Sequence, residues 1–450
     1  MNTGFLPKSS SSKIRFKKED TVTNTEHSPA AYINVREDAS TGFLPKLSSS
    51  EIRFKEEDAV TNTEHSPAAY INVREDASTG FLPKIPLKTN FPFGIYIHWP
   101  YCLSKCPYCD FFSKVKKDVP QDEIIEDYLK ELDFYYQYTG DQYVTSIFFG
   151  GGTPSLIAPQ NIEKIINHIA CRWKLSQQVE ISLEANPNSG RPKLFQDLKN
   201  AGINRLSLGI QALNDADLKF LGRTHNLQQA YQAMEEVLKQ FDNHSIDLIY
   251  ARPAQSLKQW QEEIKQAASF GFKHLSMYQL TIEDGTVFHK KGVKPLEENA
   301  AAEMYDFTNA FLHACNYNQY EISNYARPNF ESAHNQIYWT GNDYLGIGPA
   351  AHGRIKSQGK IFASTHRCIM EELTPEERAE ELILMGLRLN RGISRQNFKH
   401  NCGMDFDAFV NQENLYILLQ KKLLEDNGDS IRASDDGRLL LNKIIEDLCC

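Results

Sequence analysis

Short apolar runs alternate with amphipathic segments between residues 93 and 283, and this alternation leaves few folds open to the chain. The segments between the runs have helical spacing, as in NIEKIINHIACRWK and LQQAYQAMEEVLKQF. Strands that alternate with helices indicate βαβ units and a parallel sheet. Six such strands predict an α/β fold built on a partial parallel (β/α)6 barrel. The runs are FGIYIHW (93–99), VTSIFFGG (144–151), VEISLEANP (179–187), INRLSLGIQ (203–211), SIDLIYA (245–251) and HLSMYQLTIE (274–283).

Residues of types suited to ligand binding or catalysis stand at the ends of these runs. In open parallel sheets and barrels, ligands bind at the carboxyl ends of the strands. GGGTP at 150–154 ends the second run, and Glu184, Gln211 and Asp247 lie at or near the ends of later ones. We therefore expect the functional site at this edge of the sheet.

Three cysteines stand within eight positions after the first run. Cys102, Cys106 and Cys109 form C-x3-C-x2-C with no fourth cysteine close behind. Structural zinc takes four ligands, and neither a second knuckle nor the single His98 completes such a set convincingly. A [4Fe–4S] cube held by three thiolates leaves one iron open to a small molecule. The pattern favours the cluster, with zinc or plain buried thiols as the alternatives.

The first 88 residues differ in character from the rest of the chain. Residues 3–40 recur as residues 41–78, and TGFLPK opens a third copy at 79–84. Each copy is polar and too poor in large apolar residues to offset its chain entropy. The repeat resembles peptide inserts that mobile palindromic elements encode in some obligate intracellular bacteria. We expect residues 1–88 to be a largely disordered insert without function, with a tether as the alternative.

The remaining chain divides into three predicted parts. Residues 89–330 form the barrel core, residues 331–372 connect, and residues 373–450 form a C-terminal domain. The end of the chain reads as strand, turn, strand and helix, which predicts a winged-helix-like α+β module.

Composition excludes several classes of function. A net charge of −9 and a pI near 5.9 argue against broad nucleic-acid or membrane-surface binding. We find no apolar run long enough to span a bilayer and no secretory h-region. The nine cysteines are unevenly placed and do not form a disulfide framework. These features predict a cytoplasmic protein.

The cysteine loop resembles that of the radical S-adenosylmethionine superfamily. In that superfamily the open iron is chelated by S-adenosylmethionine, whose reductive cleavage releases a 5′-deoxyadenosyl radical. IYIHWPYC, FFGGGTPS, LEANP, LGIQALND, LGRTHN and DLIY follow in the order of the oxygen-independent coproporphyrinogen III oxidase-like family. The resemblance runs from about residue 92 to residue 450.

The resemblance implies roles for individual residues. Cys102, Cys106 and Cys109 would hold the cluster. Without the resemblance, Arg223 could equally cap a helix and Asp247 could serve as an N-cap or ion-pair partner. The chain reads DLIYARPAQ at 247–255 where the family often has DLIYGLPGQ, so Ala251 and Ala254 replace glycines. The residues that would contact S-adenosylmethionine are Tyr96, Tyr108, Gly151, Gly152, Thr153, Glu184, Gln211, Arg223 and Asp247.

Two features place the chain closer to the haem chaperone (HemW) branch than to the oxidases. Oxidases extend the motif to C-x3-C-x2-C-x-C, and Phe111 stands at that last position. Their N-terminal segment is replaced here by the repeats. HNQIYW at 334–339 matches a motif of the branch, which makes His334, Tyr338 and Trp339 candidates for haem contact. On residue types alone, a capping histidine and two core aromatics explain the same motif.

The sequence is therefore consistent with two functions. The first is a haem carrier that holds a [4Fe–4S] cluster and S-adenosylmethionine and passes haem to haem-requiring respiratory proteins. The second is an oxygen-independent coproporphyrinogen III oxidase, which would decarboxylate propionate side chains. We expect no oxidase activity and assign no catalytic residue. An electron donor is implied if the cluster is reduced, no nucleic-acid partner is expected, and a homodimer or transient contact with membrane proteins is left open.

Overall fold

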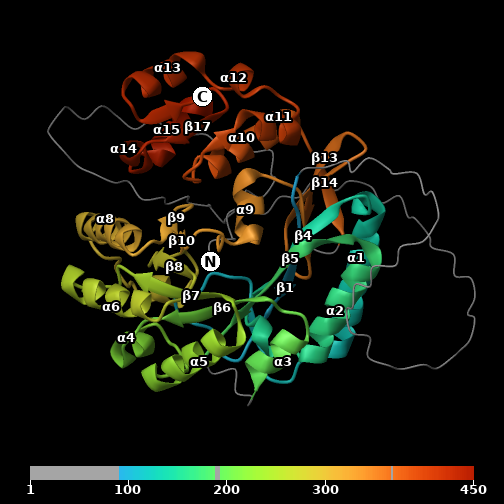
Figure 1. Cartoon of the computed structure of the whole chain (residues 1–450), viewed down its shortest axis with the longest axis vertical. Helices are drawn as coiled ribbons and strands as arrows, with labels where there is room; N and C mark the ends of the chain where they lie inside the picture. The colour runs from blue at the N-terminus through green and yellow to red at the C-terminus, as the bar shows by residue number, and fades with distance from the viewer. Residues whose placement is uncertain (1–90, 188–192, 366–367, 450) are drawn as a thin grey trace, which may run out of the picture. The chain divides into compact units, whose positions relative to one another are not determined.

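A twelve-stranded sheet organises the described part of the chain. The computed structural model describes residues 91–187, 193–365 and 368–449, so the predictions for residues 1–88 lie outside it. Six strands run parallel and adjacent in chain order (Figure 1), which confirms the predicted α/β fold. They are β1 (Phe93–Trp99), β4 (Tyr143–Gly151), β5 (Lys174–Ala185), β6 (Arg205–Gln211), β7 (Asn243–Tyr250) and β8 (His274–Gln279).

Further strands extend both edges of this sheet. Beside β8, β10 (Asn324–Ala326) and β9 (Asn318–Gln319) continue the sheet antiparallel. Beside β1, β11 (Tyr344–Ile347) pairs parallel, and an antiparallel series follows it. The predicted connecting segment is therefore structural, because its strands complete one side of the sheet. The series consists of β12 (Gly353–Ser357), β13 (Lys360–Thr365) and β14 (Ile369–Leu373).

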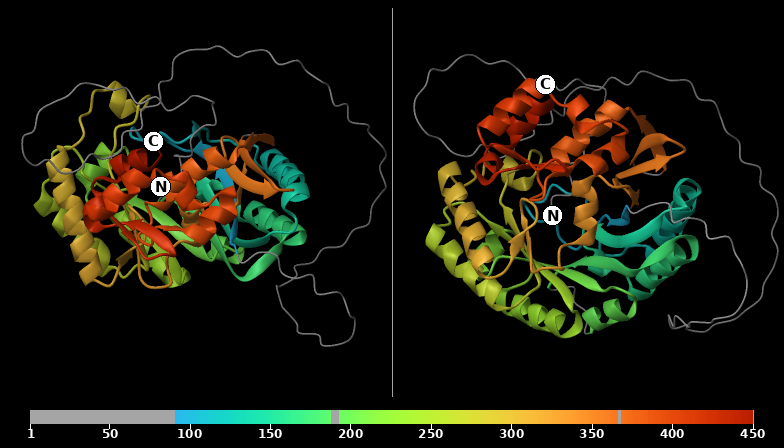
Figure 2. Two further views of the ribbon diagram at one scale, coloured as in Figure 1. Left: turned by 90° about the horizontal axis from the view of Figure 1, so that it is seen from above. Right: turned by 45° about the horizontal axis from the view of Figure 1, so that its top comes forward.

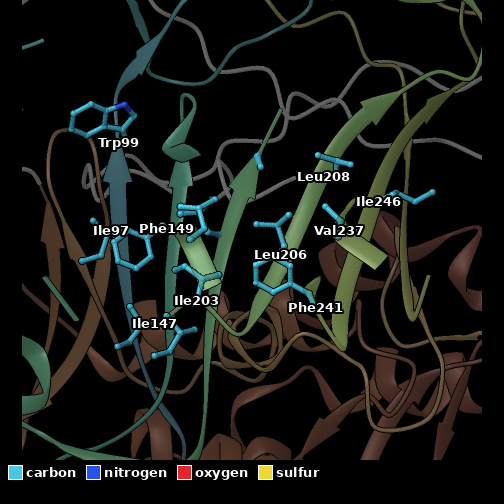
Figure 3. Close-up of a cluster of buried hydrophobic side chains, with 14 of the residues drawn as sticks. Ile97, Trp99, Ile147, Phe149, Ile203, Leu206, Leu208, Val237, Phe241 and Ile246 are labelled. Carbon is cyan, nitrogen blue, oxygen red and sulfur yellow. The ribbon is translucent and has the colours of Figure 1, made fainter. Parts of the chain in front are cut away.

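One face of the sheet is apolar and covered by helices. Alternate residues of a strand point to opposite faces, and Ile97, Ile147 and Leu206 point to the face that packs against helices (Figure 3). Val237 and Phe241 approach this face from the region of α5. The helices line its outer side (Figure 2). They are α1 (Gln121–Thr139), α2 (Pro159–Arg172), α3 (Leu194–Asn200), α5 (Leu227–Gln240), α6 (Leu257–Ser269) and α8 (Glu298–Ala314).

The opposite face carries polar side chains. Helix α9 (Ala333–Thr340) lies against it, near the amino ends of β1 and β4. The Glu180 carboxylate accepts hydrogen bonds from the backbone N–H groups of Ala333 and His334, at 3.1 and 3.4 Å. A carboxylate at a helix N-terminus satisfies otherwise unpaired donors and favours the helix dipole. This contact fixes where the HNQIYW segment lies.

The C-terminal residues build an α+β module with its own apolar core, as predicted. Its strands pair in the order β15 (Ile393–Ser394), β17 (Ser430–Ala433) and β16 (Leu424–Asp426). No helix within the described ranges is long and apolar enough to cross a membrane. The helices of the module are α10 (Pro375–Gly386), α11 (Arg395–Cys402), α12 (Phe406–Phe409), α13 (Gln412–Gln420), α14 (Asp435–Arg438) and α15 (Leu441–Cys449).

Candidate functional site

The cysteine loop is closed at its base by two short strands. β2 (Tyr101–Cys102) pairs parallel with β3 (Lys114–Val115), so the loop leaves and returns at the same place. Cys102 is buried, whereas Cys106 and Cys109 are half-buried. The backbone N–H of Cys109 donates to the carbonyl of Cys106 at 3.1 Å, which turns the chain between them. The loop thus brings all three sulfurs to the carboxyl end of β1.

Two side chains from elsewhere in the chain contact these sulfurs, one just after β4 and one in the loop before α5. Thr153 Oγ1 donates to Cys102 Sγ at 3.4 Å, and Arg223 donates to Cys106 Sγ at 3.4 Å. Asn186 joins the two, because its amide nitrogen donates to Thr153 Oγ1 at 3.2 Å and its amide oxygen accepts from Arg223. Hydrogen bonds to sulfur are one of the means by which proteins set cluster potentials. Sequence reasoning missed Asn186, although it lies in the LEANP motif at the end of β5.

Burial disfavours the charged form of two of the three thiols. It raises the pKa of Cys102, and it raises the pKa of Cys109 to about 11. Iron binding requires thiolates, so cluster binding would release protons. Among the described residues, no three His, Cys, Asp or Glu side chains lie close enough to hold a single metal ion. The cysteines of a cube bind separate irons and therefore stand further apart than ligands of one ion.

The glycine loop packs tightly against β1 and the cysteine loop. The N–H groups of Gly152 and Thr153 donate to the carbonyls of Trp99 and Tyr101, at 2.6 and 2.9 Å. Gly151 has a φ of 107°, and a Cβ placed there would lie 2.6 Å from the His98 ring. Only glycine fits such a position without strain. The loop therefore presents backbone, not side chains, at the edge where the sulfurs lie.

Glu184 and Asp247 form a buried acidic pair on the polar face. Burial and the nearby Asp247 carboxyl raise the pKa of Glu184 to about 8, and burial also raises the pKa of Asp247. Ser207 Oγ donates to Asp247 Oδ1 at 3.0 Å, while Asp247 Oδ2 has no partner. Such a pair gains from a bound cation, because each carboxylate is then stabilised.

Gln211 is a second residue with unused hydrogen-bonding capacity. It has a φ of 75° at an irregularity between β6 and β7, and its Oε1 is buried without a partner. Buried polar groups are nearly always paired, so the free oxygens of Gln211 and Asp247 fit a polar ligand. Backbone strain in a non-glycine residue is also typical of functional sites. These acceptor oxygens fit the amino group and the ribose hydroxyls of S-adenosylmethionine, which donate hydrogen bonds.

The two predicted tyrosines occupy different surroundings. Tyr108 Oη lies 3.5 Å from Arg223 and its ring packs near Phe288, beside the cysteine loop. Tyr96 Oη lies 3.0 Å from His98 Nδ1, and its ring packs against the rings of Phe148 and His334, which also contact each other. Tyr108 therefore belongs to the sulfur end of the site. Tyr96 belongs to the polar face, between Glu184 and α9.

His334 and Tyr338 belong to α9, on the side of the helix that packs on β1 and β4. His334 is fully buried, and burial lowers its pKa to about 3. Its Nδ1 lies 2.7 Å from Ser146 Oγ, and its Nε2 lies 2.7 Å from Tyr338 Oη. Both ring nitrogens are thus engaged within the protein. Iron binding by this ring requires one of these two bonds to be replaced.

Trp339, the third haem candidate, points elsewhere. It lines a cavity of about 540 Å³ between α9 and the C-terminal module. Small-molecule sites commonly have 300–1,000 Å³ and mostly apolar walls with a few polar groups. Phe91, Phe398 and Arg391 also line this cavity. His400 stacks on Phe91 with ring centroids 3.6 Å apart, and nothing in the sequence pattern singled it out.

Comparison with known proteins agrees with this architecture. A radical SAM superfamily model matches residues 96–267, and a HemN C-terminal domain model matches residues 373–440. The crystal structure of coproporphyrinogen III oxidase HemN from Escherichia coli superposes with a TM-score of 0.66 at 20% identity, over 80% of this chain and 90% of that one. The chain belongs to the radical SAM superfamily, whose members carry a [4Fe–4S] cluster and S-adenosylmethionine.

Similar full-length proteins narrow the assignment. Heme chaperone HemW of Buchnera aphidicola (subsp. Acyrthosiphon pisum) is 33% identical over 79% of this chain and 98% of its own length. HemW of Escherichia coli K12 is 33% identical over 79% and 97%. Mitochondrial radical S-adenosyl methionine domain-containing protein 1 of Mus musculus is 33% identical over 78% and 86%. Within the superfamily, the chain belongs to the HemN-like group that includes the HemW proteins.

Proposed function

We propose that the protein is a haem carrier that delivers haem to haem-requiring proteins. The observation that carries this proposal is its similarity to proteins named heme chaperone HemW across nearly their whole length. The cysteine motif agrees, because Phe111 stands where the oxidases extend it with a cysteine. The similarity to HemN at 20% identity supports the fold alone.

The cofactor site in this proposal is the sulfur end of the barrel. Cys102, Cys106 and Cys109 hold a [4Fe–4S] cluster, which supplies one-electron chemistry when bound. Thr153, Arg223 and Tyr108 surround the sulfurs, so they orient the ligand on the open iron. Gly151 and Gly152 let its methionine end approach the backbone. The polar face, with Tyr96, Glu184, Gln211 and Asp247, takes its charged and ribose groups.

Haem is proposed to bind in the cavity beside Trp339. The aromatic rings of Phe91, Trp339 and Phe398 in its mixed lining suit the porphyrin faces, and the Arg391 guanidinium suits a propionate, since guanidinium and carboxylate pair in a bidentate geometry. His334 and Tyr338 remain candidate iron ligands through movement of α9, and His400, whose ring stacks on Phe91 of the cavity lining, is a third candidate.

Anaerobic reconstitution with iron, sulfide, haem and S-adenosylmethionine tests the proposal. We expect one haem per protomer, transfer of haem to an apo-haem protein, and no conversion of coproporphyrinogen III to protoporphyrinogen IX. Conversion of that substrate by the reduced protein would establish the oxidase instead. Trp339→Ala is expected to weaken haem binding while the visible absorption of the cluster stays unchanged.

His334→Ala and His400→Ala separate the possible iron ligands. The variant that removes the true ligand changes the Soret band and lowers haem affinity. If both variants keep the wild-type Soret band and affinity, neither histidine binds the iron.

A further inference from the structure

The cysteine loop exposes apolar side chains that no contact in the fold explains. Leu103, Phe112 and Val115 are 49%, 46% and 58% exposed. They are three of nine large apolar residues with such exposure in the part of the chain that the structure describes. Val115 is the register partner of Cys102 in the β2–β3 pair. Concentrated exposed apolar surface is typical of interaction sites, and this one includes the strand neighbour of a cysteine.

Positive charge surrounds these apolar residues. Residues 101–118 contain four lysines and two aspartates, although the whole chain has a net charge of −9. All four lysines are exposed, and Lys114 Nζ lies 5.7 Å from the centre of the Phe112 ring. A local basic surface on an acidic protein attracts acidic partners and accelerates their association. The lysines are Lys105, Lys114, Lys116 and Lys117.

The loop is held in place before any partner arrives. The N–H of Lys116 donates to the Cys102 carbonyl at 3.1 Å, and that of Lys114 donates to the Pro100 carbonyl at 2.7 Å. His98 Nε2 donates to the Phe112 carbonyl at 2.9 Å, with its other nitrogen bonded to Tyr96. An ordered surface loses little entropy on binding, which favours small and transient interfaces.

We propose that Leu103, Phe112 and Val115, with the four lysines around them, form the docking surface for an acidic one-electron carrier protein. The inference rests on the cluster of the proposed function, because only a reducible centre behind this surface needs a donor. In the step, one electron passes from the reduced carrier, which is oxidised, to the oxidised cluster, which is reduced, and no proton is transferred. Close docking matters because electron transfer slows steeply with distance.

An anionic lipid surface is the other class of partner that lysines and apolar residues attract. Interfacial membrane binding ordinarily uses an amphipathic helix with a large apolar face. Here the surface is a loop and a two-residue strand, and exposed Asp110 and Asp118 are interspersed among the lysines. Mixed charge suits a protein partner with matching groups and is unfavourable against a uniformly anionic bilayer.

Stopped-flow reduction of the full-length, cluster-loaded protein tests the proposal. The probes are a reduced acidic [2Fe–2S] ferredoxin and, as a small-molecule reductant, dithionite. The test variants are Lys116→Glu/Lys117→Glu, whose side chains are exposed, and Phe112→Ser. The matched control is Lys258→Glu/Lys265→Glu, which reverses two exposed lysines on α6.

At low ionic strength we expect the ferredoxin rate constant to fall at least tenfold in the double loop variant and severalfold in Phe112→Ser. The dithionite rate and the control variant should match the wild type. Equal ferredoxin rates in all proteins would overturn the proposal, as would a parallel loss with dithionite. Lost binding to phosphatidylglycerol vesicles with unchanged ferredoxin rates would assign the surface to lipid.

Haem stoichiometry in the same proteins separates this inference from the proposed function. The loop variants should bind as much haem as the wild type, because the cavity beside Trp339 is built from other elements. If the wild type binds no haem and the ferredoxin rates still respond to the loop variants, the haem proposal fails and the docking surface stands.

Discussion

The guanidinium of Arg223 lies 3.4 Å from Cys106 Sγ and 2.9 Å from the carbonyl oxygen of Gly209. One side chain therefore links the cysteine loop after β1 to the end of β6. The same guanidinium reaches Asn186 at the end of β5. Three strand ends that are far apart in sequence meet at this one charge, next to a sulfur proposed to bind iron.

Replacing Arg223 should change the reduction potential of the cluster. A positive charge and a hydrogen bond at a ligand sulfur stabilise the reduced, more negative state. We expect Arg223→Gln to have a lower midpoint potential than the wild type, with Arg223→Lys in between. A redox titration monitored by electron paramagnetic resonance measures the midpoint potential of the cluster in each protein. Identical midpoints in the three proteins would show that Arg223 does not act on the cluster.

The affinity for S-adenosylmethionine should depend on pH through Glu184. With a pKa of about 8, the carboxyl is mostly protonated at pH 7, and a bound cation favours its ionised form. Binding then releases a proton, so affinity rises as pH rises toward 8, by up to about tenfold per unit. Calorimetric titration between pH 6 and 8.5 should show a steeper rise for the wild type than for Glu184→Gln. Parallel pH profiles of the affinity in the two proteins would contradict the role of Glu184.

The sequence predicted the barrel because its signals are local. Each of the six strands contains a short apolar run, and most of the predicted cofactor residues lie in a strand or directly after one. Parallel strands share an edge, so Thr153, Glu184 and Asp247 were expected at the same side of the sheet. Their exact partners were not predictable, because contacts such as Asn186 with Thr153 depend on how far each loop turns.

The HNQIYW segment shows where sequence reasoning stops. Its residue types allow either haem contact or a packed helix, and local pattern cannot decide between them. In the structure, His334 is buried because Glu180, 154 positions earlier, binds the N-terminus of its helix. Trp339 lies at the cavity because it follows His334 by five residues on the same helix. Only long-range contacts separate these roles.

Restoring glycine at Ala254 should stabilise the protein. Ala251 and Ala254 have φ angles of 55° and 61°, where a Cβ costs about 1–2 kcal/mol. Ala254 is exposed, so Ala254→Gly should raise the free energy of unfolding by about 1 kcal/mol. Ala251 is buried, and loss of its methyl group offsets most of the gain. Urea denaturation measures both, and a destabilised Ala254→Gly would refute the strain argument.

Acid should destabilise the fold partly through His334. Its folded-state pKa of about 3 lies below the unfolded value of 6.5, so the unfolded chain binds an extra proton between these pH values. The contribution of neutral His334 to the free energy of unfolding is complete above pH 6.5. It is lost as the pH falls, by at most about 1.4 kcal/mol per pH unit. His334→Gln should lose stability less steeply below pH 6.5 than the wild type. The exposed His313→Gln is the control, and equal slopes for all three would contradict the prediction.

Arg252, which stands where the family often has leucine, forms a buried ion pair with Glu263. Arg252 is 1% exposed, and its guanidinium bonds both carboxylate oxygens and also lies 2.9 Å from Asp217 Oδ2. Glu263 Oε1 in addition accepts from the N–H of Leu213 at 2.7 Å. The pair therefore ties the loop after β7 to α6 and to the segment after β6.

Arg252→Leu alone should be more damaging than Arg252→Leu together with Glu263→Gln. Removing one partner of a buried pair leaves an uncompensated charge and costs about 3–5 kcal/mol. Glutamine at position 263 removes that charge and keeps an acceptor for Leu213, so the double variant should recover at least half of the lost stability. Urea denaturation of the four proteins in the double-mutant cycle measures the coupling. If the double variant is as unstable as Arg252→Leu, the charge of Glu263 is not the cause, and the arginine acts through its packing and its bond to the carbonyl of Ile249.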